Sequence, residues 1–453
     1  MNHDARAWAD GHRLFFEDQL RTLVELRTVS MDPGRTPEIE ACAEAALGLI
    51  RHLGGIPTLF RAGGKPYVHG RFGDPLRPSV LVYNHLDVQP ADEPEWKAEP
   101  FRMRVDGDRY LGRGTTDDKG PALTCLLAVA HAAHRGSSLG YQLLWEFEEE
   151  VGSPHFAELM AQERAALGDV RAVLVSDTLW VSADRPSMDV GLRGFQALLL
   201  RLRTADVDAH SGVVGGGAPN PIAGLTRVLA ACFDASTGRI LVPAIRDGIL
   251  PVSDAEMDLY VRSGFDVDRF RSIYGFRRLL ATEPRELLRR LWTEPTFEVH
   301  GISGGYQGPG VKSIVPAWAE AKVSLRLVPG QEPARVLEAI RSFVAGLDPL
   351  VEVVPLGAAP AFVTSVDAPE CRAMARAVDR VLGKELVLTR GGGSIPPVSV
   401  MAGALRAPVL LMGLSLPEHG YHAPNEYFEW TQAQRGVELY ASWFEELERT
   451  TSA

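Results

Sequence analysis

The first part of this 453-residue chain alternates between helical and strand-like hydrophobic patterns. From about Ala5 to Leu53, apolar residues recur at three- and four-residue intervals and end at a Gly54-Gly55 stop, which predicts two opening helices. Strand-like runs then alternate with helical segments: SVLVYNH, a helix over 121–135, YQLLWEF, a helix over 153–166 and RAVLVSD. Because this alternation is typical of parallel strands with helices packed on them, the predicted fold class is α/β, with a mostly parallel sheet flanked by helices.

After Asp189 the pattern becomes that of a second domain. Its segments are GLRGFQALLLRLRT, a glycine-rich loop at 215–217, a helix from Pro221, AEAKVSLRLV and a helix over 332–345. The first pattern resumes at about Ser365, with a helix over 368–382, a strand over 409–412 and a helix over 431–447. We therefore predict a discontinuous catalytic domain over 1–190 and 365–453, interrupted by an inserted α+β domain over 191–364.

Composition and charge restrict the class of partner. The formal net charge of −11 argues against nucleic acid and anionic membranes, because both are polyanions. The N-terminus lacks the apolar core of a signal peptide, and no run approaches the roughly 20 apolar residues of a membrane span. The four cysteines stand far apart without a CxxC pair, as expected for reduced thiols in the cytoplasm. A soluble cytoplasmic protein with a small-molecule substrate is therefore predicted.

Ionisable side chains follow the predicted strands at their carboxyl ends, where open α/β sheets bind ligands. His85 ends the run SVLVYNH, and Asp87 can accept a hydrogen bond from its other ring nitrogen and so fix its tautomer. In GRGTTDDKGP, Asp117 and Asp118 stand side by side, a clustering of like charge that a cation would neutralise. A solvated turn would explain His85 alone, and a helix cap would explain Asp118 alone, but neither explains the aspartate doublet.

Carboxylates and histidines follow the remaining strands in the same way: Glu148, Glu149 and Glu150 after YQLLWEF, Asp177 at the end of RAVLVSD, and His419 and His422 after the strand over 408–412. Together with His85 and the aspartate doublet they form a mixed nitrogen and oxygen ligand set. Two such sets that share one carboxylate would hold two cations. The residues alone do not say which of the three glutamates binds a metal.

The order of these motifs resembles a known family. The segments TTDDKG, EEEVGS, LVSD, AHSG, GGGSIP and GYHAPNE are similar to those of the metallopeptidase family of carboxypeptidase G, aminoacylase, succinyl-diaminopimelate desuccinylase and carnosinase. The resemblance spans nearly the whole chain. Within this family, YNHLDVQP, GRGTTDDKGP, DAHSGVVGG, KSIVP and SLRLVPG look most similar to the cytosolic nonspecific dipeptidase and carnosinase branch.

The resemblance implies a role for each residue of the metal centre. His85 and Asp177 bind one divalent ion, Glu150 and His422 bind the other, and Asp117 bridges the two.

The resemblance also identifies the general base. The family's EE-x-GS pattern makes Glu149 the base, which takes a proton from the water between the ions and returns it to the leaving amine. Glu148 is left as a solvent-facing charge or a partner of the ligands, and His419 is assigned to loop structure. The bond from Asp117 to Asp118 is commonly cis in this family.

The insertion domain carries further candidates by the same match. His210 in AHSG resembles a histidine that reaches the partner subunit's active site and stabilises the oxyanion, so a homodimer formed through the insertion domain is implied. Arg326 in SLRLVPG resembles the arginine that receives the substrate's carboxylate. Ser313 in KSIVP and Ser394 in the GGGSIP loop are the other implied substrate-binding residues.

Substrate and metal choice stay open within this resemblance. A dipeptidase is favoured, with an N-acyl amino acid amidohydrolase on the same scaffold as the alternative. A remoter alternative, an inactive binding protein, would lack a ligand or Glu149, whereas this chain has them all. Dipeptidase relatives often carry an acidic residue after the arginine of the glycine-rich loop, whereas Arg390 is followed by Gly391. Zinc is the expected metal, although manganese and cobalt accept the same ligands.

Overall fold

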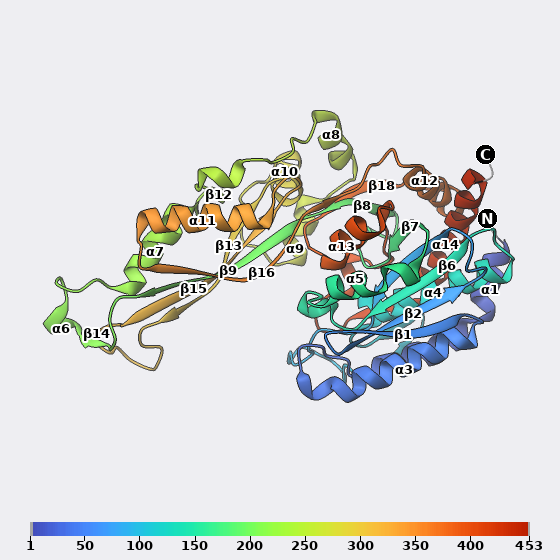
Figure 1. The fold of residues 1–453 in the computed structure, drawn as a ribbon, viewed down its shortest axis with the longest axis horizontal. Helices are drawn as coiled ribbons and strands as arrows, with labels where there is room; N and C mark the ends of the chain where they lie inside the picture. The colour runs from blue at the N-terminus through green and yellow to red at the C-terminus, as the bar shows by residue number, and fades with distance from the viewer. Residues whose placement is uncertain (1–2, 452–453) are drawn as a thin grey trace. The chain divides into compact units, whose positions relative to one another are not determined.

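The computed structural model describes residues 3–451, and the chain divides into two compact units (Figure 1). Unit 1 comprises Met1–Val190, Thr364–Arg390 and Ile395–Ala453, and unit 2 comprises Gly191–Val363 and Gly391–Ser394. The roles of these units as a catalytic domain and a dimerisation domain stay predictions.

The centre of unit 1 is a mostly parallel sheet with antiparallel strands at its edges. The parallel strands, in spatial order, are β6 (Gly140–Glu146), β3 (Ser79–His85), β7 (Val170–Val175) and β19 (Val409–Leu411). The antiparallel additions are β1 (Ile56–Ala62) and β2 (Lys65–Phe72) beside β6, and β8 (Ser187–Leu192) beside β19. Strand β18 (Val387–Gly391) pairs with β8. Strand β17 (Phe362–Val363) pairs with the last two residues of β8, Gly191 and Leu192, and all four of these residues belong to unit 2. The predicted α/β class with a mostly parallel sheet is confirmed.

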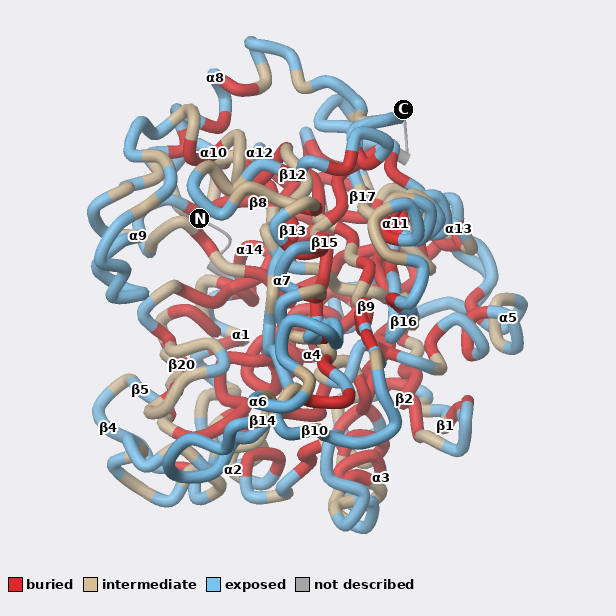
Figure 2. Tube along the Cα trace, turned by 90° about the vertical axis from the view of Figure 1, so that its left-hand side faces the viewer, coloured by how far each residue is buried: buried red, intermediate tan, exposed pale blue. Residues whose placement is uncertain are grey.

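Helices cover both faces of this sheet. They are α1 (His3–Gly11), α2 (Arg13–Glu25), α3 (Thr36–His52), α4 (Gly120–His134), α5 (Phe156–Leu167), α12 (Pro369–Leu382), α13 (Pro396–Leu405) and α14 (Trp430–Thr451). Residues of β2 that point to opposite faces contact different helices. The ring centroids of Tyr67 and Phe156 of α5 are 6.1 Å apart on one face, and Gly70 lies against Ile50 of α3 on the other. The four parallel strands and α4 are consequently among the most buried segments, and buried positions are drawn red in Figure 2.

The chain opens with three helices, so the prediction of two was wrong. Helix α1 ends at Gly11, and α2 begins at Arg13 after His12 adopts φ −106° and ψ 7°, outside the helical region. Glycine has low helix propensity, which explains a break at this point that hydrophobic spacing alone does not reveal. Helix α3 begins only after the turn at Pro33–Arg35.

Unit 2 is built on a separate antiparallel sheet. Its strands, in spatial order, are β13 (Thr296–Gly304), β15 (Trp318–Leu327), β9 (Gly194–Arg203) and β16 (Val351–Ala359). Helices α7 (Pro221–Cys232) and α11 (Pro333–Leu347) pack on the sheet (Figure 1). Alternation along β9 buries Leu198, Leu200 and Leu202 in the core of this unit, while Arg201 and Arg203 are exposed. The predicted α+β character is therefore confirmed.

Shorter elements complete unit 2. They are β10 (Ala209–His210), α6 (Ser211–Val214), β11 (Phe233–Asp234), β12 (Arg239–Ile240), α8 (Asp254–Arg262), α9 (Val267–Ile273), α10 (Pro284–Trp292) and β14 (Ile314–Val315). In residues 3–451, no helix combines the length and apolar character needed to cross a bilayer.

Candidate metal centre

The carboxyl ends of the four parallel strands bring the candidate ligands together in unit 1. Strand β3 ends at His85, β6 leads into Glu149 and Glu150, and β7 is followed by Asp177. His422 lies in the loop after β19. Because parallel strands end at the same edge of the sheet, side chains distant in sequence become neighbours there.

At this edge, six side chains form two groups that could each hold a metal ion. His85, Asp118 and Asp177 are one group, and Asp117, Glu150 and His422 are the other, each with ligand atoms within 4.8 Å of one another. The structure thus brings all five sequence-proposed ligands together and adds Asp118.

Asp117 lies between the two histidines. Its Oδ1 lies 3.0 Å from Nε2 of His85, and its Oδ2 lies 3.0 Å from Nε2 of His422. His85 Nε2 also lies 3.8 Å from Asp177 Oδ2, and His422 Nε2 lies 3.2 Å from Glu150 Oε2. The two oxygens of one carboxylate therefore face different halves of the site, which is the geometry that a bridging ligand needs.

The loop that carries Asp117 is held in place by hydrogen bonds from its main-chain nitrogens. Gly114 begins it at φ 85°, where a side chain would be strained, and the Asp117–Asp118 peptide bond is cis, as the family resemblance implied. The buried carboxylate of Glu426 accepts hydrogen bonds from the main-chain nitrogens of Gly114 (2.9 Å), Thr116 (2.9 Å) and Asp117 (3.1 Å). Glu426 thereby fixes the position from which Asp117 projects.

Asp87 connects His85 to the acidic loop after β6. Its Oδ1 lies 3.3 Å from Nδ1 of His85, whose ring nitrogen also lies 3.1 Å from the Asp87 carbonyl oxygen. The same carboxylate accepts hydrogen bonds from the main-chain nitrogens of Glu149 (3.1 Å) and Glu150 (3.0 Å). Asp87 therefore orients the imidazole and the two glutamates together.

The pKa values of several carboxyl groups and of a histidine in the site are raised. Burial raises the pKa of Asp177 to about 7 and raises those of Asp118 and Glu149 well above their usual range. Hydrogen bonds with Asp117 and Glu150 raise the pKa of His422 to about 11. Burial thus favours protons on these three carboxylates, whereas hydrogen bonds from His422 and His85 lower the pKa of Asp117. Bound cations would stabilise the ionised carboxylates in place of protons.

The donor set fits divalent cations. Imidazole nitrogen and carboxylate oxygen are ligands that zinc, manganese and cobalt accept. Oδ1 of Asp118 is buried and has no hydrogen-bond partner among residues 3–451, although Oδ2 accepts from Asn84 Nδ2 at 2.7 Å. A buried carboxylate oxygen without a partner is costly unless a cation or a proton satisfies it.

Glu148 is buried, so its proposed solvent-facing position is wrong. Its carboxylate accepts hydrogen bonds from Tyr67 Oη at 2.5 Å and from the main-chain nitrogen of His155 at 3.0 Å, and its side chain is 1% exposed. The aromatic ring of Tyr67 and the turn at His155 cover this position, which a run of three glutamates does not reveal. Glu148 fixes the end of the acidic loop and does not belong to either ligand group.

Unit 2 carries the other candidates as two pairs. Exposed His210 and Ser313 are adjacent where β10 pairs with β14, since Ser211 N donates to the Ser313 carbonyl oxygen at 3.0 Å. The His210 ring accepts a hydrogen bond from Gly212 N at 3.0 Å through Nδ1. The second pair lies near the carboxyl end of β15, where Arg326 Nη1 donates to Ser394 Oγ at 3.0 Å.

Several residues that contact the ligands were not identified from the sequence. Tyr421 Oη donates to Asp177 Oδ1 at 2.7 Å, and Gln89 Nε2 donates to Glu150 Oε2 at 2.7 Å. Tyr421 directly precedes His422, so adjacency was an available signal for it, whereas Gln89 stands four residues after His85 and only the fold brings it to Glu150. His419 Nδ1 accepts from Leu416 N at 3.2 Å and lies 3.0 Å from Thr116 Oγ1, consistent with a role in loop structure.

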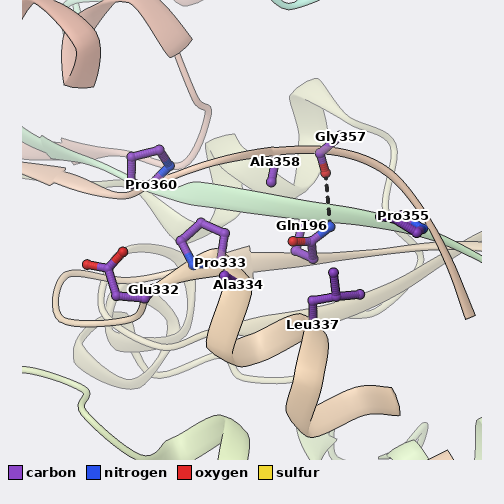
Figure 3. Close-up of a pocket in the computed structure, with 9 residues that line it drawn as sticks. All are labelled: Gln196, Glu332, Pro333, Ala334, Leu337, Pro355, Gly357, Ala358 and Pro360. Atoms are coloured by element: carbon purple, nitrogen blue, oxygen red, sulfur yellow. Dashed lines mark hydrogen bonds between the residues drawn. The ribbon is translucent and has the colours of Figure 1, made fainter.

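A groove on unit 2 contains none of the candidate residues. It has a volume of about 460 Å³ and lies beside the start of α11, lined by Glu332, Pro333, Leu337 and residues of β9 and β16 (Figure 3). Gln196 crosses its floor and donates to the Gly357 carbonyl oxygen at 3.2 Å. Its lining is largely apolar, and a single carboxylate, that of Glu332, does not make the clustered ligand set of a metal centre.

Comparisons with known proteins agree with this geometry. A sequence model of peptidase family M20/M25/M40 matches residues 81–446. Beta-Ala-His dipeptidase of Rattus norvegicus is 32% identical over 391 residues, which cover 84% of this chain and 79% of that protein. Cys-Gly metallodipeptidase DUG1 of Candida albicans is 31% identical over 439 residues, which cover 91% of this chain and 90% of that protein. The solved structure of the di-peptidase Dug1p from Saccharomyces cerevisiae has a TM-score of 0.86 at 26% identity, covering 99% of this chain and 98% of that one.

Proposed function

Because this chain belongs to peptidase family M20/M25/M40 and is a metallopeptidase, we propose that it hydrolyses the peptide bond of dipeptides with two divalent ions. The observation that carries the proposal is the position of Asp117 between His85 and His422, 3.0 Å from each. One carboxylate in this position can serve two ions at once. The names of the two dipeptidase relatives support a dipeptide substrate over an N-acyl amino acid.

In this proposal His85 and Asp177 hold one ion, Glu150 and His422 hold the other, and Asp117 serves both. When bound, two such ions lower the pKa of water and stabilise negative charge on a carbonyl oxygen. Zinc is the proposed metal, with manganese or cobalt as substitutes.

Glu149 is the proposed general base. Its carboxylate accepts a proton from the attacking water and delivers that proton to the leaving amine. Glu149 belongs to neither ligand group, and the hydrogen bond from its main-chain nitrogen to Asp87 fixes where its side chain begins. Asp87 therefore supports both the base and the orientation of His85.

The proposed substrate contacts lie in unit 2. Arg326 receives the substrate's C-terminal carboxylate, Ser394 lies against Arg326, and His210 with Ser313 acts on the substrate bound by the partner subunit of a homodimer. The exposure of His210 and Ser313 is compatible with a contact to a second subunit. We further propose a cytoplasmic location, supported by four cysteines that are buried and free.

A substrate panel tests the proposed function. We expect dipeptides to be hydrolysed faster than tripeptides and N-acyl amino acids when zinc, manganese or cobalt is supplied. Preferential cleavage of N-acyl amino acids would favour the amidohydrolase alternative, which would use the same ligands.

Amidation of the substrate tests Arg326. A dipeptide amide should lose roughly tenfold to a hundredfold in kcat/KM relative to the free acid, because the amide cannot form a charge-assisted bidentate contact. Arg326→Ala should remove most of this difference, whereas the exposed Arg203→Ala should preserve it. Equal hydrolysis of acid and amide by the wild type would contradict the proposed contact.

Subunit mixing tests His210. The inactive variants His210→Ala and Glu149→Gln should regain activity when mixed, because one site of each heterodimer then combines a wild-type Glu149 with a wild-type His210. Native mass spectrometry of differently tagged subunits measures the exchange. Sustained inactivity after proven exchange would argue against action across the dimer.

A further inference from the structure

A second arginine, Arg193, lies beside Arg326 in unit 2. The register of β15 with β9 places Arg326 opposite Phe195, two residues after Arg193. Ser394 links the two arginines, since its hydroxyl accepts from Arg326 Nη1 at 3.0 Å and donates to the Arg193 carbonyl oxygen. Arg193 Nε donates to the Gly392 carbonyl oxygen at 3.1 Å, so the same glycine-rich loop holds both side chains.

The terminal nitrogens of Arg193 have no acceptor among the described residues. Nη1 is buried without a hydrogen-bond partner anywhere in residues 3–451, and in that same range Nη2 forms no hydrogen bond either. Leaving a buried cationic donor unpaired is costly, so a group outside the described chain is expected to satisfy it. The charge of Glu298 acts on both arginines, but this carboxylate is exposed and pairs with neither in the described chain.

The two guanidinium groups also repel each other. Burial, together with the charge of Arg326, lowers the pKa of Arg193 to about 10, and burial lowers that of Arg326. Both groups stay cationic at neutral pH. A bound anion would offset this repulsion, and a planar carboxylate matches the paired terminal donors of a guanidinium.

We propose that Arg193 is a second substrate-binding arginine, whose Nη1 and Nη2 hold the same C-terminal carboxylate that Arg326 receives. This inference rests on the proposed function, since it takes the substrate to be a peptide with a free carboxylate. Ser394, a proposed substrate contact, also links the two arginines, because its hydroxyl accepts from Arg326 Nη1 and donates to the main-chain carbonyl oxygen of Arg193.

Two Arg193 variants and one control separate binding from loop support. Arg193→Gln and Arg193→Lys should each lower kcat/KM for a free dipeptide by roughly tenfold to a hundredfold and leave its amide nearly unchanged. Lysine keeps the charge but lacks the paired donors of a guanidinium. If the glutamine variant does not fold, the lysine variant therefore tests whether Arg193 binds the carboxylate. The control is Arg201→Gln, because Arg201 lies on the same strand β9 but is exposed and paired with Glu320. Equal losses for acid and amide would mean that Arg193 only supports the loop, and would overturn the proposal.

A binding measurement distinguishes this inference from the proposed function. Calorimetric titration of the full chain, stripped of metal, should show N-acetylglycylglycine binding at least about tenfold more tightly than its amide, and the Arg193 variants should lose that preference. If the wild type cleaves no dipeptide yet keeps an Arg193-dependent preference for the acid, the proposed function fails, whereas the binding of a peptide carboxylate by Arg193 is supported. No preference in the wild type, or an undiminished preference in the variants, would refute the inference.

Discussion

Glu149→Gln should retain both metal ions and lose at least about a hundredfold in kcat, because an amide has nearly the shape of the carboxylate but cannot accept the proton. The glutamine keeps the main-chain hydrogen bond to Asp87, and residue 149 belongs to neither group of metal-binding side chains. Elemental analysis and steady-state kinetics on the same preparation measure both quantities. A matched control is Glu163→Gln on helix α5, which should behave as the wild type.

Two results would remove Glu149 from this role. Loss of both ions in Glu149→Gln would make it a ligand, and wild-type turnover would assign proton transfer to another group. Near-ultraviolet circular dichroism of each variant separates these outcomes from misfolding.

Asp117→Ala should bind neither ion at wild-type affinity and should be inactive. Its two oxygens lie 3.0 Å from different histidines, so the substitution removes a ligand from both halves of the site. Without the bridging negative charge, two cations so close together would also repel each other. Calorimetric metal titration measures this directly.

Terminal ligands provide the comparison. Asp177→Ala and Glu150→Ala should each weaken the binding of one ion and leave the affinity for the other unchanged, since each residue belongs to one group. If Asp117→Ala still binds one ion with full affinity, Asp117 serves a single site and the bridging assignment is wrong.

The position of the candidate site could be predicted from the sequence because its residues follow strands that are easy to identify. The runs that end at His85 and Asp177 are almost wholly buried, and a continuous apolar run is typical of a central parallel strand. His85, Glu150, Asp177 and His422 therefore have predictable places after the carboxyl ends of strands, whereas Asp117 lies in the segment that leads into helix α4.

Other features depend on tertiary contacts that no local pattern encodes. Glu148 has the same sequence neighbours as Glu149, yet Tyr67 from another strand and His155 hold it in the interior. The Ser394 hydroxyl donates to the main-chain carbonyl oxygen of Arg193, a residue that is distant in sequence and that only the fold brings near Ser394. The break after α1 depends on a single glycine and histidine, which hydrophobic spacing does not distinguish from a continuous helix.

Dipeptide hydrolysis should require two metal ions held by Asp117 and its neighbours. The most direct test removes all metal from the enzyme, restores zinc stepwise and follows both bound metal and hydrolysis of a good dipeptide. We expect activity to develop with the second equivalent and to vanish in Asp117→Ala. Full activity with one equivalent, or dipeptide hydrolysis by the metal-free protein, would contradict the proposed requirement for two metal ions.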